Sequence, residues 1–265
     1  MVVTLNNAQV DGNIGVAPKT NIVGGTSGAY LYGNLDLDQA GTATANGSYT
    51  MTGTFNQNAA TDTLLTSATS AAMSAFNAAK GDSATSVTCS GTGCSTTNIM
   101  NPGGAITLTG TSGINVVNLS NLELNNSSHS LVLDDTSPGA VFVINIAGTF
   151  SVTNGADITV AGGLSQMNVL FNVEATSGVV CFSSGSNCSS TGSNTSDIQG
   201  VVLAPYQDIT MDGAQVDGEV ISGGLTLTNS TVDAPEPATL MLLATGLAGL
   251  GVRLRRIGKR ASRRD

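Results

Sequence analysis

Four cysteines form two close pairs, Cys89 with Cys94 and Cys181 with Cys188, each inside a loop rich in Ser, Gly and Asn. Their spacing does not fit the Cys-x-x-Cys pattern of a zinc site, and the single histidine, His129, cannot complete one. We therefore expect disulfides, as in exported proteins. Four cysteines allow three pairings, of which proximity favours Cys89–Cys94 and Cys181–Cys188.

The carboxylates offer weak candidates for catalysis or metal binding. Asp134-Asp135 is the only adjacent acidic pair suited to glycoside cleavage, and no arginine precedes Arg253 to hold an acidic sugar. Two acidic groups could supply oxygen ligands for Ca²⁺: Asp36 with Asp38, and Asp212 with Asp217 and Glu219. We favour turns and solvated corners for all of these acids and a solvated surface role for His129. We predict no catalytic site, no metal site and no cofactor.

Threonine is the other repeated side chain that could bind a surface. Thr-x-Thr runs occur at residues 42–44, 50–54, 107–111 and 226–228. Such ladders can order water on a flat sheet and bind ice, but threonine also favours any exposed strand. These runs do not recur at one fixed position of a repeat, which weakens the ice hypothesis. Sugar recognition usually needs aromatic platforms, and the chain has four tyrosines and no tryptophan.

Charge is divided along the chain. Seven of the nine basic residues follow Val252, whereas residues 1–252 contain only Lys19 and Lys80 as cations. Phosphate contacts require Lys and Arg, so the acidic body is not expected to bind nucleic acid. Only 10% of the residues are charged and 40% are hydrophobic, which is too apolar for a disordered chain.

Internal repeats indicate how the body is built. Residues 4–12 match residues 210–218, with Ala-Gln-Val-Asp-Gly identical, and a third copy spans residues 226–233. Each copy is a short alternating strand, an Asn, Asp or Gly corner that tolerates a left-handed backbone, and another strand. The 16-residue offset between the last two copies predicts a β-solenoid.

Further segments fit this mainly β fold. Strands are expected at residues 105–109, 115–119, 140–146, 168–173 and 200–203. Residues 141–146 are nearly all apolar, which indicates a strand buried on both faces. Residues 59–80 carry Leu64, Leu65, Phe76 and small apolar residues at helical spacing, which predicts one helix packed along the solenoid.

Several of these segments carry a resemblance to a known family. The helix beside the solenoid and the segments 139–148, 168–173, 200–205 and 216–221 make residues 1–233 similar to the choice-of-anchor A family. The resemblance implies a bacterial surface adhesin without catalytic residues. Ice-binding β-solenoids with a flanking helix share much of the same pattern, so ice binding remains the alternative function.

The final stretch, residues 234–265, differs from the body. Pro235-Glu236-Pro237 precedes a short hydrophobic helix expected at residues 238–254, which is followed by a basic tail. The 15 uncharged residues from Ala238 to Val252 would span about 22 Å as a helix, short of the roughly 30 Å hydrocarbon core. The bases predict that the tail stays cytoplasmic while the body is exported.

This tail resembles the PEP-CTERM sorting signal. The resemblance implies an exosortase-type membrane enzyme as a partner, removal of the tail near Pro235-Glu236-Pro237, and display at the cell surface or in the extracellular matrix of a Gram-negative bacterium. The inner membrane would be occupied transiently, and exopolysaccharide or other surface components are further expected partners. Residues 1–6 lack the features of a secretory signal peptide, so we expect either that the start codon is placed too late or that the sequence is a truncated fragment.

Overall fold

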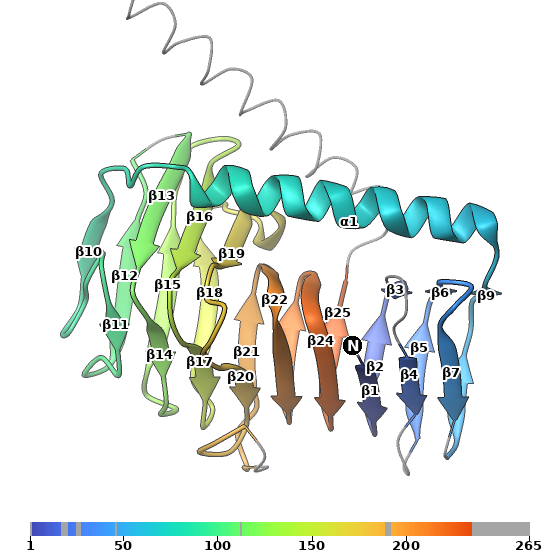
Figure 1. Cartoon of the computed structure of the whole chain (residues 1–265). Helices are drawn as coiled ribbons and strands as arrows, with labels where there is room; N and C mark the ends of the chain where they lie inside the picture. Colours follow the sequence, from blue (N-terminus) through green and yellow to red (C-terminus); the bar gives the residue numbers. More distant parts are fainter. Residues whose placement is uncertain are drawn as a thin grey trace, which may run out of the picture.

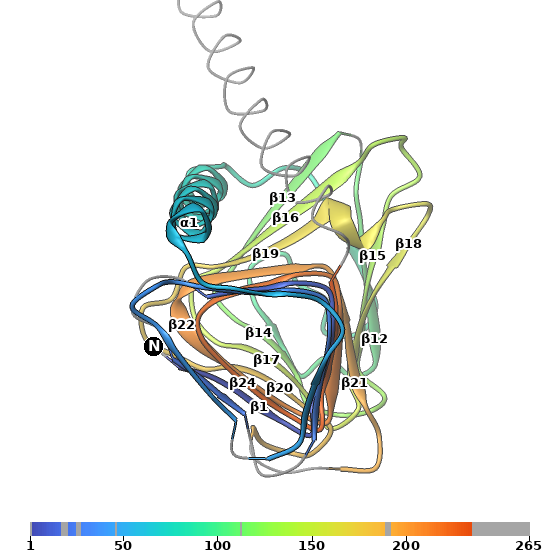
Figure 2. The ribbon, with the colours of Figure 1, turned by 90° about the vertical axis from the view of Figure 1, so that its right-hand side faces the viewer.

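The computed structural model describes residues 2–16, 21–24, 28–45, 47–111, 113–188 and 192–234. The strands wind into a β-solenoid whose cross-section is a triangle, and the helix α1 (Ala59–Lys80) lies along one side (Figures 1 and 2). Strands stack in parallel within each side, except that β10 pairs antiparallel with β12. The predicted solenoid with one flanking helix is therefore what the described residues form.

The first side, called here the helix-covered face, lies beneath α1. At one end it is built from β13 (Ile114–Leu119), β16 (Val141–Ile146), β19 (Val169–Val173) and the first parts of β22 (Val201–Asp212) and β24 (Val220–Thr228). At the other end it continues as β3 (Ile14–Val16), β6 (Leu35–Leu37) and β9 (Phe55–Asn56). A short 3-10 helix, Gln166–Asn168, leads into β19.

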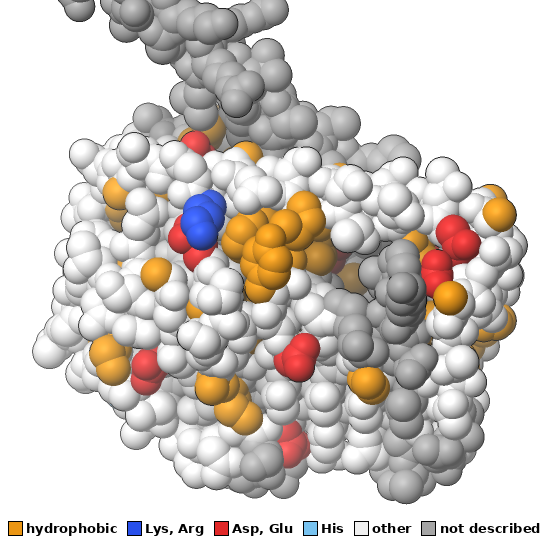
Figure 3. Space-filling model, viewed as in Figure 1, with side chains coloured by type: hydrophobic (Ala, Val, Ile, Leu, Met, Phe, Trp, Pro, Cys, Tyr) orange, Lys and Arg blue, Asp and Glu red, His pale blue; other side chains and the backbone are white. Residues whose placement is uncertain are grey.

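The second side, called here the threonine face, has no helix of the described residues over its strands. It comprises β11 (Ile99–Met100), β14 (Leu122–Leu124), β17 (Phe150–Thr153), β20 (Val180–Ser183), the second parts of β22 and β24, β1 (Val2–Asn6), β4 (Asn21–Gly24) and β7 (Thr42–Ala45), in that spatial order. Figure 3 looks onto this side and α1 and shows a surface made mostly of uncharged polar groups.

The third side, called here the acidic face, is a ladder of ten strands. In spatial order they are β10 (Thr88–Ser90), β12 (Ala105–Thr109), β15 (Ser130–Asp134), β18 (Asp157–Ala161), β21 (Ser196–Gln199), β23 (Ala214–Asp217), β25 (Thr231–Asp233), β2 (Gln9–Asp11), β5 (Ala29–Tyr32) and β8 (Tyr49–Met51).

The two ends of the described chain meet in the middle of the solenoid. β1 pairs with β24 in the register Thr4 to Thr226, and β2 pairs with β25 in the register Asp11 to Asp233. The N-terminal turns stack outward from there to β9, and α1 carries the chain back along the whole solenoid to β10 (Figure 1). The three sequence repeats therefore lie on three adjacent turns, because Thr210 also pairs with Thr226.

The core is a continuous stack of inward-pointing aliphatic and aromatic side chains. Phe150, Phe171 and Phe182 lie in its centre, with ring centroids 5.2 and 5.0 Å from Phe150. All three rings are fully buried. Alternation along each strand places every second residue in this core and leaves the others to define the outer faces.

The corners between the threonine and acidic faces use left-handed residues, as the repeats predict. Asn7, Asn154 and Asn229 have φ values of 47°, 60° and 49°, and Gly213 has 70°. The side chain of Asn7 donates to Asn229 Oδ1 on the adjacent turn at 2.8 Å. Asparagine tolerates a left-handed backbone, and its side chain can form a hydrogen bond with the residue stacked on the next turn. These two properties explain why asparagine recurs at these corners.

α1 covers its face through apolar packing and an asparagine ladder. Phe76 and Ala79 pack on Val143 and Leu170, which point outward from the sheet, so β16 is buried on both faces as predicted. Asn145 Nδ2 donates to the Ala79 carbonyl at 2.8 Å, and Asn172 Nδ2 donates to Asn145 Oδ1 at 2.8 Å. Leu64, which shares the helical spacing, is 53% exposed and takes no part in this packing.

The expected C-terminal helix at residues 238–254 and the motif Pro235-Glu236-Pro237 lie outside the described residues. Within the described part of the chain, no helix is both long and apolar enough to cross a bilayer. Ala234 is the last described residue, and its amide donates to the Asp11 carbonyl at 2.8 Å. The body thus leads into its C-terminal segment from the middle of the solenoid.

Candidate binding faces

The threonine face aligns hydroxyls that the sequence scatters. Thr210, Thr226 and Thr4 occupy one column on three adjacent strands, directly in register. Their chain neighbours Met211, Leu227 and Leu5 are buried in the core, so the three threonines point outward. Adjacent strands lie about 4.8 Å apart, so this column is a regular row of hydroxyls on a flat sheet.

The Thr-x-Thr runs themselves are spread over two faces. Thr42 and Thr44 lie in β7 on the threonine face, where Val23 separates Thr44 from Thr4. Thr50 lies in β8 and Thr107 in β12, at opposite ends of the acidic face. Two members of the threonine column, Thr4 and Thr210, belong to no such run, so a search for Thr-x-Thr could not have found it.

The acidic face carries a row of carboxylates. Asp217, Asp233 and Asp11 are in register on adjacent strands, and Asp157 on β18 is in register with Asp197 on the adjacent strand β21. Gln215 donates to Asp217 Oδ1 at 2.7 Å, and Gln9 donates to Asp11 Oδ2 at 2.9 Å. The amides thus hold two of the carboxylates in place along the row.

The closely spaced and partly buried carboxyl groups of this face have raised pKa values. Burial, together with the nearby charges of Asp217 and Asp157, raises the pKa of Asp197 to about 6. Burial also raises the pKa of Asp157, although the Asp197 amide, 3.2 Å from Asp157 Oδ1, opposes this rise. The folded protein therefore keeps part of this face protonated at mildly acidic pH.

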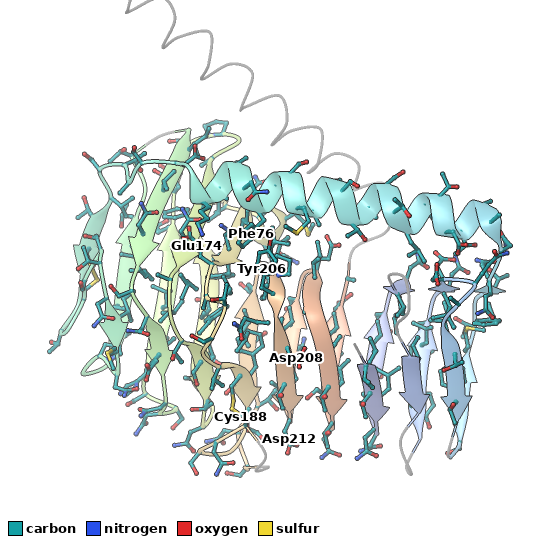
Figure 4. The ribbon with its side chains drawn as sticks, in the orientation of Figure 1. Phe76, Glu174, Cys188, Tyr206, Asp208 and Asp212 are labelled. Atoms are coloured by element: carbon teal, nitrogen blue, oxygen red, sulfur yellow. A yellow bond between two sulfur atoms is a disulfide. The ribbon has the colours of Figure 1, made fainter. Side chains whose placement is uncertain are left out.

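The second Ca²⁺ candidate is separated by the winding of the solenoid. Asp212 lies on the threonine face (labelled in Figure 4), Asp217 lies on the acidic face, and Glu219 precedes β24 where the chain turns onto the helix-covered face. Burial raises the pKa of Glu219 to about 7. Across the described residues, no group of three or more His, Cys, Asp or Glu side chains could hold a metal ion.

The other candidate acids serve local structure. Asp36 Oδ1 accepts a hydrogen bond from Asn56 at 2.8 Å, and Asp38 Oδ1 accepts one from the Ala40 amide at 2.9 Å. Asp135 is buried, and the hydrogen bond that it accepts from the Ser137 amide lowers its pKa, with a smaller contribution from Asn115. Neighbouring Asp134 ends strand β15.

His129 also has a local role. Its Nδ1 accepts from the Asn125 amide at 3.4 Å, in the turn that leads into β15. This contact belongs to the turn itself.

Both cysteine pairs form disulfides with their near neighbours, Cys89 with Cys94 and Cys181 with Cys188. The second bond closes the loop that follows β20, at the corner between the threonine and acidic faces. A polar hollow nearby is lined by Ser184, Gln215 and Asn229 among others, and no acid, base or thiol occurs among the described residues that line it.

One feature of the acidic face escaped the sequence interpretation. Tyr30 and Tyr32 alternate with buried Leu31 in β5, so both rings point outward, and they are 45% and 47% exposed. Their planes lie within 10° of parallel, with centroids 6.4 Å apart. The signal available in the sequence was the Tyr-x-Tyr spacing, which places both rings on one side of a strand.

Comparisons with known proteins agree with this architecture. Residues 2–233 match the family described as "Putative Ice-binding-like adhesive domain", and residues 233–256 match the PEP-CTERM protein-sorting motif. No match was found among curated proteins.

Solved structures with a similar fold include ice-binding proteins. One is an ice-binding protein from an Antarctic biological consortium, 23% identical, with a TM-score of 0.50 over 88% of this chain and 84% of that one. Another is the glycosylated ice-binding protein LeIBP from an Arctic yeast, 16% identical, with a TM-score of 0.49 over 88% and 90%. At 23% identity, the likeness to the first of these structures concerns the fold alone. With its family match over residues 2–233, this chain belongs to the ice-binding-like adhesive domain family and carries a PEP-CTERM sorting motif after that domain.

Proposed function

We propose that this protein is a non-enzymatic, adhesin-like protein that acts by displaying the two uncovered faces of a rigid solenoid. The observation that supports this is the difference between the three sides. α1 packs over apolar residues on one side, whereas the other two present rows of threonines, carboxylates and amides. A flat, polar and rigid surface suits adhesion better than catalysis, which needs convergent reactive groups in a concave site.

The sorting motif makes this an exported, cell-surface protein and implies processing by an exosortase, which is a membrane enzyme. We propose the finer course as well. The protein would pass through the inner membrane of a Gram-negative bacterium, held transiently by a helix at residues 238–254. The tail, residues 234–265, would be cut off near Pro235-Glu236-Pro237, leaving the domain of residues 1–233 at the surface or in the matrix.

Replacing Pro235, Glu236 and Pro237 with alanine tests this course. We expect the variant to keep its tail, so mass spectrometry finds the intact C-terminus and surface display falls at least about tenfold. An alanine replacement of Thr226 in the same strain serves as the control and should be processed normally. Normal processing of the triple variant would contradict the proposed cleavage region.

Ice binding is the second candidate, and one observation favours it. Thr210, Thr226 and Thr4 form a flat row of hydroxyls, the arrangement that can order water on a sheet. Interruption of the same column by Val23 and Cys181 limits this row to three strands. We therefore place adhesion first.

The two functions separate in one experiment on the secreted, processed protein. Adhesion predicts binding to cells or matrix of the producing bacterium and no inhibition of ice recrystallisation at micromolar protein. Ice binding predicts inhibition that Thr226→Lys abolishes, because a charged side chain breaks the flat row. Thr159→Lys, on the acidic face, is the matched control. Inhibition of ice growth without any cell or matrix binding would overturn the adhesin proposal.

A further inference from the structure

The exposed tyrosine pair on the acidic face is an uncommon feature of this molecule. Tyr30 and Tyr32 are two of only four tyrosines in the chain, and nearly half of each is exposed to solvent. Leu31 between them is 1% exposed and anchors β5 in the core, so the backbone below the rings is rigidly held. Two large rings with a common orientation on a firm strand form a preorganised aromatic surface, which marks an interaction site.

The surroundings of the pair are polar and negative. β5 lies beside β2, so Gln9 is in register with Tyr30, and Asp11 is in register with Tyr32. Asp11 continues into the row of Asp233 and Asp217 on the next two strands. The only Lys or Arg within the described residues is Lys80, which lies on α1 and is 4.0 Å from Glu174.

This combination selects a ligand by its chemistry. A pyranose ring presents C–H bonds on its flat faces, and these pack against the negative face of an aromatic ring. Ammonium groups are attracted both to carboxylates and to aromatic faces, whereas uronic acids or phosphates would be repelled by the carboxylate row. The open strands around the pair accommodate an extended polymer more readily than a small molecule, which needs a concave site.

We propose that Tyr30 and Tyr32 form a binding site for a polysaccharide that contains amino sugars with free ammonium groups. The two rings stack on successive sugar units, and Asp11 with its neighbour Asp233 attracts the ammonium groups. This inference rests on the proposed adhesive function, since it names the class of surface component that the protein contacts. The adhesive contact is thereby assigned to the acidic face, and the threonine face takes no part in it.

The test uses the secreted, processed protein and three soluble polymers in affinity electrophoresis. The polymers are chitosan, which carries ammonium groups, a neutral β-glucan, and polygalacturonate. We expect retardation by chitosan that weakens with added salt, at least about tenfold weaker retardation by the glucan, and none by polygalacturonate. Binding to the glucan as tight as to chitosan, or binding to polygalacturonate, would overturn the amino-sugar assignment.

Variants localise the site. The double replacement Tyr30→Thr and Tyr32→Thr keeps strand-favouring residues on β5, and we expect it to weaken chitosan binding at least tenfold. The double replacement with phenylalanine keeps the rings and should bind within about twofold of the natural protein. Tyr206→Ala removes an equally exposed ring, which lies against Phe76 beside α1 (Figure 4), and is the matched control for tyrosine loss.

Thermal unfolding verifies that each variant is folded. If the threonine variant does not fold, the phenylalanine variant still tests the proposal, because it keeps both rings. Loss of chitosan binding by the phenylalanine variant would contradict stacking. Asp11→Asn should weaken chitosan binding by about two- to fivefold and reduce its salt dependence. Undiminished chitosan binding by a folded threonine variant would refute the proposal, as would chitosan-independent dimerisation through the same tyrosines. Surface display measured on intact cells is a separate readout, so a failure of export is distinguishable from a failure of this site.

Discussion

The helix-covered face and the acidic face are built on the same core from neighbouring stretches of chain, yet they have opposite surfaces. Val116, Val143 and Leu170 stand in one outward column beneath α1. Ser130, Asp157 and Asp197 form the corresponding column on β15, β18 and β21 of the acidic face. The outward-pointing residues of the strands therefore decide whether a face is covered by α1 or exposed to solvent.

The largest effect is expected from making the covered face polar. Leu170 is 3% exposed, and Leu170→Asn removes its packing against α1 and buries an amide, which should cost about 3–4 kcal/mol. Thr159→Asn makes a matched change on the acidic face and should cost no more than about 0.5 kcal/mol. Urea unfolding measures both values. Equal values for the two variants would mean that α1 does not stabilise the face it covers.

A smaller loss should follow from cutting the asparagine ladder. Asn145→Ala removes the bond to the Ala79 carbonyl and leaves Asn172 Nδ2 without its acceptor on Asn145, at a cost of about 2 kcal/mol. Hydrogen exchange in the last turns of α1 should accelerate. Gln215→Ala, which cuts a bond on the acidic face, is the comparison and should leave exchange in α1 unchanged.

Two partly buried carboxyl groups, Asp197 on the acidic face and Glu219 just before β24, should make stability depend on pH. The folded pKa of Asp197 is raised to about 6 and that of Glu219 to about 7, so ionisation is more costly in the folded state than in the unfolded one. Stability from these groups is complete at low pH and is lost as pH rises through these values. Between pH 5 and pH 8 the free energy of unfolding should fall by about 1–2 kcal/mol, after allowance for solvent screening.

Asp197→Asn with Glu219→Gln should flatten this profile. The pKa of Asp135 is lowered by the Ser137 amide, so its effect on stability has the opposite pH dependence. The stability that Asp135 contributes is lost as the pH falls below about 4. The melting temperature of both proteins, followed from pH 4 to pH 8, checks this. A natural protein more stable at pH 8 than at pH 5 would contradict the raised pKa values.

The smallest effect belongs to the open threonine row. Replacing Thr4, Thr210 and Thr226 with valine keeps the strand-favouring branched shape and should change stability by no more than about 0.5 kcal/mol. Because the hydroxyls point outward, their loss should alter only what the face binds. Adhesion and ice recrystallisation assays on this variant show which function, if either, uses the row. A loss above about 2 kcal/mol would show that these side chains are structural.

Much of the local structure could be predicted from the sequence. The helix occupies residues 59–80 as expected, and the strand expected at 105–109 is β12. Apolar periodicity and left-handed corners depend on residues close together in the chain, which is why these assignments succeed. Helical spacing alone did not show which residues of α1 face the sheet: Leu65 and Phe76 are buried, whereas Leu64 is exposed.

The outer faces could not be predicted in the same way. The sequence repeat indicated that residues 4–12 resemble 226–233, but not that they occupy adjacent turns 222 positions apart along the chain, where Asn7 meets Asn229. Few tyrosines and no tryptophan argued against an aromatic platform, yet β5 places two rings on one face. Composition counts residues over the whole chain, whereas a surface depends on which of them are neighbours in space.

The sequence by itself determined the elements of this protein: its alternating strands, its asparagine and glycine corners, its helix, and the contrast between an acidic body and a basic tail. Those features follow from local backbone preferences and from composition. Only the tertiary structure decided the order of stacking and therefore the faces, with Thr4 beside Thr226 and Tyr32 beside Asp11. Parallel strands form hydrogen bonds through their backbones, whatever side chains they carry. The sequence pattern of the individual strands is therefore compatible with many stacking orders. The path of α1 and the packing of one common core select the order that is found.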